Sequence, residues 1–313
     1  VQINAELSKL QIQLSVINRQ VRREIIASRL ERDTTAAPPP EAFAVWEFDS
    51  DLRDSLGTLH GTAHGNARIE GGALVLDGKS FVSTAAIGQN INEKTLEVWV
   101  QLDNLNQRGG GAITIENLNG GVFDSIVFGE QESQLWMPCS NGFVRTSSFN
   151  GSQELLATQR PIHMAIVYRA DGTITAYRDG LVYGQPVQKT ALQKYAAGAA
   201  DIIFGLRHQP VGGNRFLTGR IHKAAFYDRA LTEEEVAASA GNEAEYVSEK
   251  QIANWLSKDG LRQRTELQAR VTRVTADRNR HAGIANRTIY TCLLYTSPSP
   301  RDQRGARMAA WGC

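Results

Sequence analysis

Two polar blocks of the sequence carry the side-chain types that proteins use to bind hydroxyl-rich molecules. Residues 120–146 and 207–215 together supply eight candidate ligand-binding residues: Asp124, Trp136, Asn141, Arg145, Arg207, His208, Asn214 and Arg215. Aromatic faces stack on sugar rings, fixed amide, carboxylate and guanidinium groups bond hydroxyls, and loops on a rigid scaffold commonly carry such groups. The blocks therefore predict a ligand site. The alternative is a structural link in which Arg145 or Arg207 pairs with Asp124 and anchors the loops.

Three aspartates near residue 50 form a second candidate site. Asp49, Asp51 and Asp54 could bind Ca²⁺, because hard cations are held by several carboxylate oxygens. The EF-hand pattern fails, since Arg53 occupies the third ligand position. The alternative is that these aspartates form turns by accepting hydrogen bonds from their own backbone.

Histidines and cysteines offer no stronger metal or redox motif. His60 and His64 are four residues apart, but glycines surround them, so we expect a loop without a metal. Cys139, Cys292 and Cys313 cannot build a disulfide framework or a Cys₄ zinc site, and the chain has no CxxCH haem-attachment motif. Ca²⁺ is the one cofactor that these residues leave open, and Cys139 is expected to be a buried thiol.

The overall charge excludes some partners. The 313 residues carry 34 Lys and Arg against 33 Asp and Glu, a formal net charge of +1. A nearly neutral chain gives no electrostatic case for nucleic acid as a partner. No run approaches the ~20 apolar residues of a membrane-spanning helix. The chain begins at Val1 without a signal-peptide pattern, and we expect it to be an internal piece of a longer protein.

Both ends of the chain have helical periodicity. Residues 1–33 are predicted to form one helix, because their apolar side chains repeat with the spacing of a coiled-coil seam. The proline-rich residues 34–41 end this helix and form a stiff linker. Residues 247–287 return to a helical pattern with an imperfect seam, interrupted at Gly260. The seam could pair with a second copy of the chain, but we expect the two helices to pack on each other as an antiparallel coiled-coil hairpin.

Between the helices, residues 42–241 change to the pattern of short β-strands. In residues 95–102, for example, apolar side chains occupy every second position. The dipeptides at 71–72, 171–172 and 179–180 are hairpin-turn signals. Many short strands with almost no helix indicate an antiparallel sandwich or jelly roll.

The end of this β region is its most specific signature. Residues 219–236 read GRIHKAAFYDRALTEEEV, an alternating strand that leads into a short helix with Thr232 as N-cap and Glu235 three residues later. This ending, with LVLDGKSFVST at 74–84 and KTLEVWVQL at 94–102, resembles the concanavalin A-like, laminin-G-like jelly roll. The resemblance implies an all-β antiparallel jelly-roll sandwich, here flanked by the two long helices.

A looser resemblance extends over nearly the whole chain. Helices on both flanks, with GGVFDSIVFGE at 120–130, SNGFVRT at 140–146 and IFGLRH at 203–208, make the chain similar to the middle of planctomycete-type proteins. Those carry a cytochrome c-like domain and two domains of unknown function, which implies an exported parent protein whose haem lies upstream. The stretch 292–313 fits neither family. It resembles translated sequencing-adapter sequence, and we expect it to be non-native and to add no packing.

The resemblance also raises the question of hydrolase activity. Glycosidases of this fold use an E-x-D-x-x-E strand whose two glutamates flank the scissile bond. Glu47 and Asp49 match its start, but Leu52 stands where the second glutamate is needed. We therefore expect a non-catalytic module that binds a glycan or another cell-surface ligand. A structural spacer without a ligand and a divergent glycoside hydrolase are the alternatives.

Overall fold

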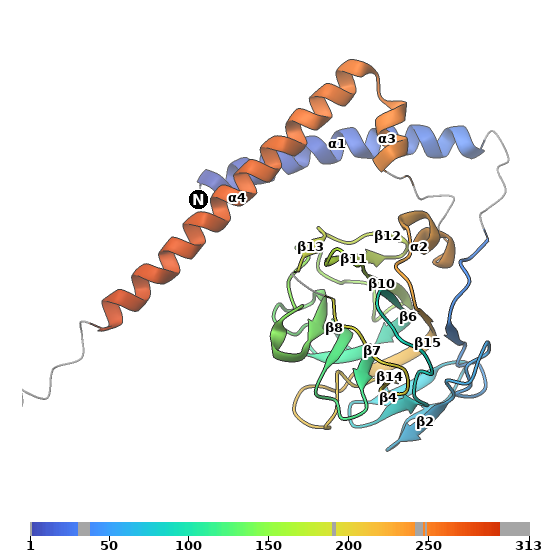
Figure 1. The fold of residues 1–313 in the computed structure, drawn as a ribbon. Coiled ribbons are helices and arrows are strands. Elements are labelled where there is room, and N and C mark those ends of the chain that lie inside the picture. The colour runs from blue at the N-terminus through green and yellow to red at the C-terminus, as the bar shows by residue number, and fades with distance from the viewer. Residues whose placement is uncertain (1, 31–37, 190–191, 242–246, 248, 295–313) are drawn as a thin grey trace, which may run out of the picture. The chain divides into compact units, whose positions relative to one another are not determined.

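The computed structural model describes residues 2–30, 38–189, 192–241, 247 and 249–294, and the chain divides into two compact units. One unit spans residues 34–248 and is a β-sandwich. The other combines residues 1–33 with residues 249–313 and is helical where it is described (Figure 1).

The larger sheet of the sandwich, sheet A, is built from β1 (Ala44–Trp46), β3 (Arg68–Ile69), β4 (Leu74–Asp77), β6 (Lys94–Leu102), β10 (Ile162–Tyr168), β11 (Thr173–Arg178), β12 (Leu181–Val182), β13 (Val187–Gln188) and β15 (Thr218–Tyr227). The strand order is β12-β11-β10-β6-β15-β4-β3, with β1 also paired to β15 and β13 to β11. These pairings are antiparallel. Because β6 pairs with β15 near the other end of the unit, long-range pairing holds the sheet together.

The second sheet, sheet B, is built from β2 (Gly61–His64), β5 (Phe81–Thr84), β7 (Gly110–Asn117), β8 (Phe123–Phe128), β9 (Trp136–Ser140) and β14 (Ala200–Phe204). Its order is β2-β5-β14-β7-β8-β9, and its pairings are antiparallel as well. The prediction of an antiparallel all-β sandwich is therefore confirmed.

The main hydrophobic core lies between the two sheets. Leu96, Val98 and Val100 of β6 belong to it and are fully buried, as their alternation predicts. Ile126 and Phe128 of β8 contribute to the same core from sheet B. Burying a side chain of this size stabilises the fold by about 1.5–3 kcal/mol. The core thus decides which face of β8 is turned inward and which is turned away from the sandwich.

A short helix covers part of the outer face of sheet A. α2 (Glu233–Ser239) begins with the predicted capping box: Glu235 N–H donates to Thr232 Oγ1 at 3.2 Å, and the Glu235 carboxylate accepts from Thr232 N–H at 2.8 Å. Val236 is buried against Tyr227 and Val167 of the sheet. This part of the outer face is therefore occupied by the protein's own chain.

All three predicted turn dipeptides lie in hairpins. Residues 71–72 separate β3 from β4, residues 171–172 separate β10 from β11, and residues 179–180 separate β11 from β12. Asp179 and Gly180 have φ angles of 49° and 75°. Two successive positive φ angles are what a type I′ hairpin turn requires.

The expectation of a loop at His60 and His64 is wrong, because Gly61–His64 forms β2 at the edge of sheet B. This strand has no apolar alternation and is held by its ladder to β5. The His64 ring stacks on Phe81 with centroids 4.3 Å apart, and its Nε2 lies 2.8 Å from Ser83 Oγ. A tertiary ladder, not a local pattern, makes this segment a strand.

The helical unit consists of α1 (Gln2–Leu30), α3 (Glu249–Trp255) and α4 (Lys258–Leu294). α1 contacts α4 in the antiparallel sense: Arg264 Nε donates to Asn18 Oδ1 at 2.8 Å, and Arg270 lies 3.6 Å from Glu6. In Figure 1 the two helices cross and then diverge. None of the described helices is long and apolar enough to span a bilayer.

The second helical segment departs from the single helix expected over residues 247–287. It breaks between α3 and α4, where Gly260 N–H donates to Ser257 Oγ at 3.2 Å and so caps the start of α4. The interruption thus comes before Gly260 and not at it. α4 continues to Leu294, so the first residues of the stretch 292–313 are helical, while residues 295–313 lie outside the described part of the chain.

Candidate ligand-binding cleft

A cleft of about 420 Å³ opens where the two polar blocks meet on sheet B. It is lined by residues 119–121, Phe123, residues 139–143, residues 207–210 and Arg215. Phe123 and Cys139 alternate with the core residues of β8 and β9 and pack in a separate small cluster. The cleft therefore lies on the outer face of sheet B, away from the core.

The loop between β14 and β15 forms one wall of the cleft. Its two arms are joined by the Arg207 N–H, which donates to Arg215 O at 2.8 Å. Thr114 Oγ1, on β7 beneath the loop, lies 3.1 Å from the Arg207 carbonyl oxygen. These bonds hold the loop against the outer face of the sheet, so its polar side chains are carried on a fixed backbone.

Gly120 allows the opposite wall to approach this loop. Its φ is 69°, and a Cβ added to it would lie 2.1 Å from Gln209 O. Only glycine meets both conditions without strain. The close backbone contact places residues 119–121 against residues 207–210, which brings the two blocks together.

The cleft contains four of the eight residues that the sequence nominated. Asn141, Arg207, His208 and Arg215 line it, whereas Asp124, Trp136, Arg145 and Asn214 do not. Asn214 lies beside the cleft, and its Oδ1 accepts from Arg207 Nη2 at 3.4 Å. This hydrogen bond restrains the Arg207 side chain.

Asp124 and Arg145 form a structural link and not a ligand site. The Asp124 carboxylate is completely buried and lies 2.6 Å from Arg145 Nε, 2.9 Å from Lys94 Nζ and 3.1 Å from Tyr195 OH. Burial lowers the pKa of Lys94, and the neighbouring charge of Asp124 opposes that change. The prediction that Asp124 and Arg145 bind a ligand is corrected, because Asp124 sits on the inward-facing side of β8 and compensates two buried cations.

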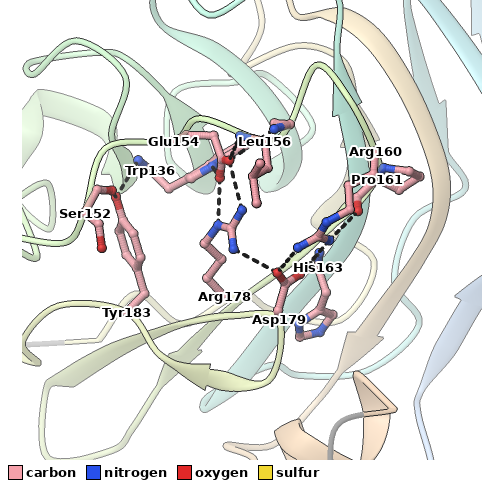
Figure 2. A network of polar contacts seen from close by, with 11 residues as sticks. Trp136, Ser152, Glu154, Leu156, Arg160, Pro161, His163, Arg178, Asp179 and Tyr183 are labelled. Carbon is pink, nitrogen blue, oxygen red and sulfur yellow. Dashed lines mark hydrogen bonds and ion pairs between the residues drawn. The ribbon is translucent and has the colours of Figure 1, made fainter. Parts of the chain in front are cut away.

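Trp136 is a core residue and not an aromatic platform. It is 1% exposed, and its Nε1–H donates to Glu154 Oε2 at 3.2 Å. Figure 2 shows Arg178 between this glutamate and Asp179, donating to the two Glu154 oxygens at 2.8 and 2.9 Å and to Asp179 Oδ2 at 2.8 Å. Burial raises the pKa of Glu154, but the hydrogen bonds from Arg178 and the backbone outweigh it, so the pKa is lowered. The prediction of ligand stacking on Trp136 is wrong, because its ring has no free face.

Phe143, which the sequence analysis did not single out, is the exposed aromatic residue at the cleft. It lies in the short 3₁₀ turn η1 (Asn141–Phe143) and is 52% exposed. Gly142 and Phe143 both have a φ of 56°. A non-glycine residue in this left-handed region costs roughly 1–3 kcal/mol, and such strain clusters at functional sites. The Asn141-Gly142 turn dipeptide ahead of an aromatic residue was the sequence signal that could have located it.

His208 is held in one orientation on the loop wall. Its ring stacks on Phe123 with centroids 4.3 Å apart, and its Nδ1 lies 2.6 Å from Gln209 O. Since a carbonyl oxygen only accepts, Nδ1 carries the proton and Nε2 is left as an acceptor in the neutral ring. Burial lowers the pKa of His208, and nearby Arg215 lowers it further. The neutral ring is therefore the form expected at neutral pH.

A pair of buried carboxylates lies beneath the loop, and the sequence analysis missed it. Glu116 of β7 is the direct ladder partner of Asp201 of β14, and the two are 0% and 5% exposed. Gln209 N–H donates to Glu116 Oε2 at 2.8 Å, while Glu116 Oε1 and Asp201 Oδ1 have no hydrogen-bond partner in the described part of the chain. Burial raises the pKa of each to about 7, and the charge of Asp201 adds to the rise at Glu116. Acidic residues in the strand runs AITIEN and ADIIF were the available signal.

The three aspartates nominated for Ca²⁺ do not gather into a metal site. Within the described residues no group of three or more acidic, histidine or cysteine side chains could hold a metal ion. Asp54 is buried and accepts backbone N–H bonds from Val45, Leu56 and Leu59 at 3.0–3.2 Å. Asp51 accepts from Arg53 N–H at 2.9 Å. The Ca²⁺ assignment to Asp49, Asp51 and Asp54 is corrected, because backbone groups already occupy two of the carboxylates.

The expectation for Cys139 is confirmed. Cys139 is a buried free thiol in the wall of the cleft. Burial raises the pKa of this thiol, which suppresses the reactive thiolate form.

Comparison with known proteins places this geometry in a family. Residues 76–237, just over half of the chain, match the family described as the concanavalin A-like lectin/glucanases superfamily, Laminin_G_3. Domain 4 of AbnA, a GH43 extracellular arabinanase from Geobacillus stearothermophilus solved in complex with arabinotriose, is 22% identical, with a TM-score of 0.51 and coverage of 66% of this chain and 100% of that domain. Trypanosoma rangeli sialidase is 13% identical, with a TM-score of 0.50 and coverage of 73% of this chain but only 38% of the sialidase. No curated protein matches the chain. At these identities the two solved structures show a shared fold.

Proposed function

The chain belongs to the concanavalin A-like lectin/glucanases superfamily, and from that premise we propose that its β-sandwich is a non-catalytic module that binds a glycan in the cleft on sheet B. The cleft combines an exposed aromatic ring, an amide, an imidazole acceptor and a guanidinium, from Phe143, Asn141, His208 and Arg215. Sugar rings and their hydroxyls are held by such groups. The arabinanase domain that shares the fold was solved with arabinotriose, which supports the same ligand class.

The exposure of Phe143 is the observation that carries this proposal. A large apolar side chain that is 52% exposed gains little from folding, and its positive φ costs stability. A ligand that stacks on the ring would bury this apolar surface and gain binding energy from it. The neighbouring residue Asn141 and the opposite wall at His208 supply hydrogen-bonding groups around the ring's position in the cleft.

Glycan-array screening of the full chain, followed by calorimetry on the best ligand, tests the proposal. Phe143→Ala is expected to weaken binding about tenfold, because aromatic contacts contribute roughly 0.5–1.5 kcal/mol beyond their buried area. Val144→Ala is the matched control, since Val144 is 60% exposed but does not line the cleft. Failure of the wild-type chain to bind any glycan, or full affinity in Phe143→Ala, would contradict glycan binding in this cleft.

A structural spacer is the second candidate function, and the buried Asp124 network favours it. The two sheets are joined by the ion pairs of Asp124 with Lys94 and Arg145. Such a link suits a rigid module that holds its neighbouring domains at a fixed spacing. If the module is only a spacer, Phe143→Ala should leave the stability of the module unchanged. The chain should then bind no glycan at all. The array experiment therefore separates the two functions.

Hydrolase activity has less support. Leu52 replaces the second glutamate of the glycosidase strand pattern, and the described residues that line the cleft include no carboxylate. Glu116 and Asp201 are adjacent carboxylates, but both are buried and Glu116 is held by the backbone of Gln209. Release of reducing sugar from a polysaccharide by the purified chain would be the result that favours a glycosidase.

The wider context belongs to the same proposal. The resemblance to planctomycete-type proteins supports an exported parent protein, with any haem in a separate cytochrome c-like domain. The antiparallel contacts between α1 and α4 support a helical hairpin in the second unit of the chain. The sequence of the complete gene would test the exported parent protein through an export signal, and the haem domain through a CxxCH motif.

A further inference from the structure

The charge of the cleft lining points to a more specific class of ligand. Two of the lining side chains are cationic, Arg207 and Arg215, and among the described residues no Asp or Glu lines the cleft. A neutral sugar does not require this imbalance. An anionic ligand group gains from it, because the surrounding protein excludes part of the solvent that would screen the charges.

The two arginines differ in how far their charge is already compensated. Arg207 forms an ion pair with Glu130, and its side chain is nearly buried. Arg215 is partly exposed, and within the described part of the chain no carboxylate forms an ion pair with it. Its positive charge adds to the effect of burial in lowering the pKa of His208. Arg215 is therefore the cation in the cleft that remains available to a ligand.

The orientation of Arg215 suits a planar anion. One of its terminal nitrogens, Nη1, donates to the backbone oxygen of Pro210. This bond restrains the guanidinium plane and leaves the remaining N–H donors for a ligand. A guanidinium presents paired donors that match the two oxygens of a carboxylate, and such charge-assisted pairs are stronger than neutral hydrogen bonds.

We propose that the cleft binds a sugar that carries a carboxylate, of the uronic or sialic acid class. Arg215 holds the carboxylate, Phe143 stacks on the sugar ring, and His208 Nε2 accepts from a hydroxyl. The proposal rests on the glycan-binding function proposed above and adds the charge of the ligand to it.

Calorimetry with matched sugars tests the charge of the ligand directly. The full chain at pH 7 is titrated with methyl galacturonide against methyl galactoside, methyl glucuronide against methyl glucoside, and sialyllactose against lactose. At least one acidic member is expected to bind tenfold or more tightly than its neutral partner. Arg215→Gln should remove this preference, because it should weaken binding of the acidic member much more than binding of the neutral member.

Two further variants separate charge from fold. Arg220→Gln removes the same charge from an arginine on β15 that is 38% exposed and pairs with Glu70 outside the cleft, so the acidic preference should persist. Arg215→Lys keeps the charge but loses the paired donors, and is expected to retain only part of the preference. If Arg215→Gln fails to fold, an undiminished preference in Arg215→Lys overturns the role of Arg215.

The possible results distinguish this proposal from the one on which it rests. Equal binding of acidic and neutral sugars overturns the carboxylate proposal and leaves glycan binding intact. A preference for sulfated over carboxylated sugars also overturns it. Failure of the wild-type chain to bind any of these sugars or any arrayed glycan overturns the glycan-binding function itself.

Discussion

Replacing Asp201 with asparagine is expected to change how the stability of the β-sandwich depends on pH. Asp201 faces Glu116 across the β14–β7 ladder, and the two side chains are buried beneath the cleft loop. Burial raises the pKa of both carboxyl groups to about 7. Two neighbouring buried carboxylates repel each other when both are ionised, so the pair favours a state that retains a proton.

The sign of the effect follows from proton binding. In the unfolded chain both groups titrate near pH 4, whereas in the native protein they hold protons up to about pH 7. Between these values the native state binds more protons, so the free energy of unfolding decreases as pH rises. The loss is complete above pH 7 and absent below pH 4.

The magnitude can be worked from the pKa of Asp201. Its rise from 3.8 to about 7 corresponds to roughly 4 kcal/mol at about 1.4 kcal/mol per pKa unit. Glu116 is buried beside Asp201 and repels it, so the cost of ionisation is shared between the two groups. We therefore expect one substitution to remove about half of this roughly 4 kcal/mol cost. Asp201→Asn is therefore expected to stabilise the protein by about 2 kcal/mol at pH 8 and by less than about 0.5 kcal/mol at pH 4.

Urea unfolding of the full chain at pH 4, 6 and 8, followed by tryptophan fluorescence, measures this effect. The control is Asp171→Asn, because Asp171 accepts the Thr173 N–H at 2.8 Å and this bond lowers its pKa. Its substitution should destabilise at pH 8, the opposite sign. An Asp201→Asn variant that is less stable than the wild type at pH 8, or a stability difference between the two proteins that does not grow from pH 4 to pH 8, would refute the reasoning.

Three other substitutions test separate parts of the structure. Asp124→Ala should lower the free energy of unfolding by about 3–5 kcal/mol, because it leaves Lys94 and Arg145 as buried unpaired cations; a loss below about 1 kcal/mol in urea unfolding would contradict the buried network. Phe143→Gly should weaken glycan binding about tenfold, as Phe143→Ala does, while stability is kept or raised by about 1 kcal/mol, since glycine tolerates the positive φ; a large fall in Tm would show that the ring packs. Thr232→Ala should cost about 0.5–2 kcal/mol through loss of the α2 cap, with an unchanged Tm arguing against the capping box.

Local features of the fold were predictable because their causes lie within a few residues. The Asp179-Gly180 turn needs only two residues that accept positive φ between adjacent strands. The α2 cap needs only Thr232 and Glu235, three positions apart. The alternation in β6 likewise determined which of its side chains enter the core. By contrast, β2 has neither alternation nor a turn signal, and only its ladder to β5 makes it a strand.

The candidate site was predictable at the level of segments but not of individual side chains. The polar blocks at 120–146 and 207–215 do meet, and four of the nominated residues line the cleft. The strand register decides the rest. On β8 and β9, Asp124 and Trp136 fall on the inward face, so the same polar and aromatic types that suggested a ligand site are used in packing and in buried ion pairs.

By itself, the sequence therefore determined the all-β sandwich, its hairpins and caps, and the two segments that could form a site. The tertiary structure alone decided which side chains of these segments reach solvent. Their exposure depends on which face of its strand each side chain occupies, and on contacts between residues far apart in the chain. Gly120 against Gln209 and Glu116 against Asp201 are such contacts, separated by more than eighty residues. Spacing along the chain carries no information about pairs of this kind, since they form only when the sheets and the β14–β15 loop are in place.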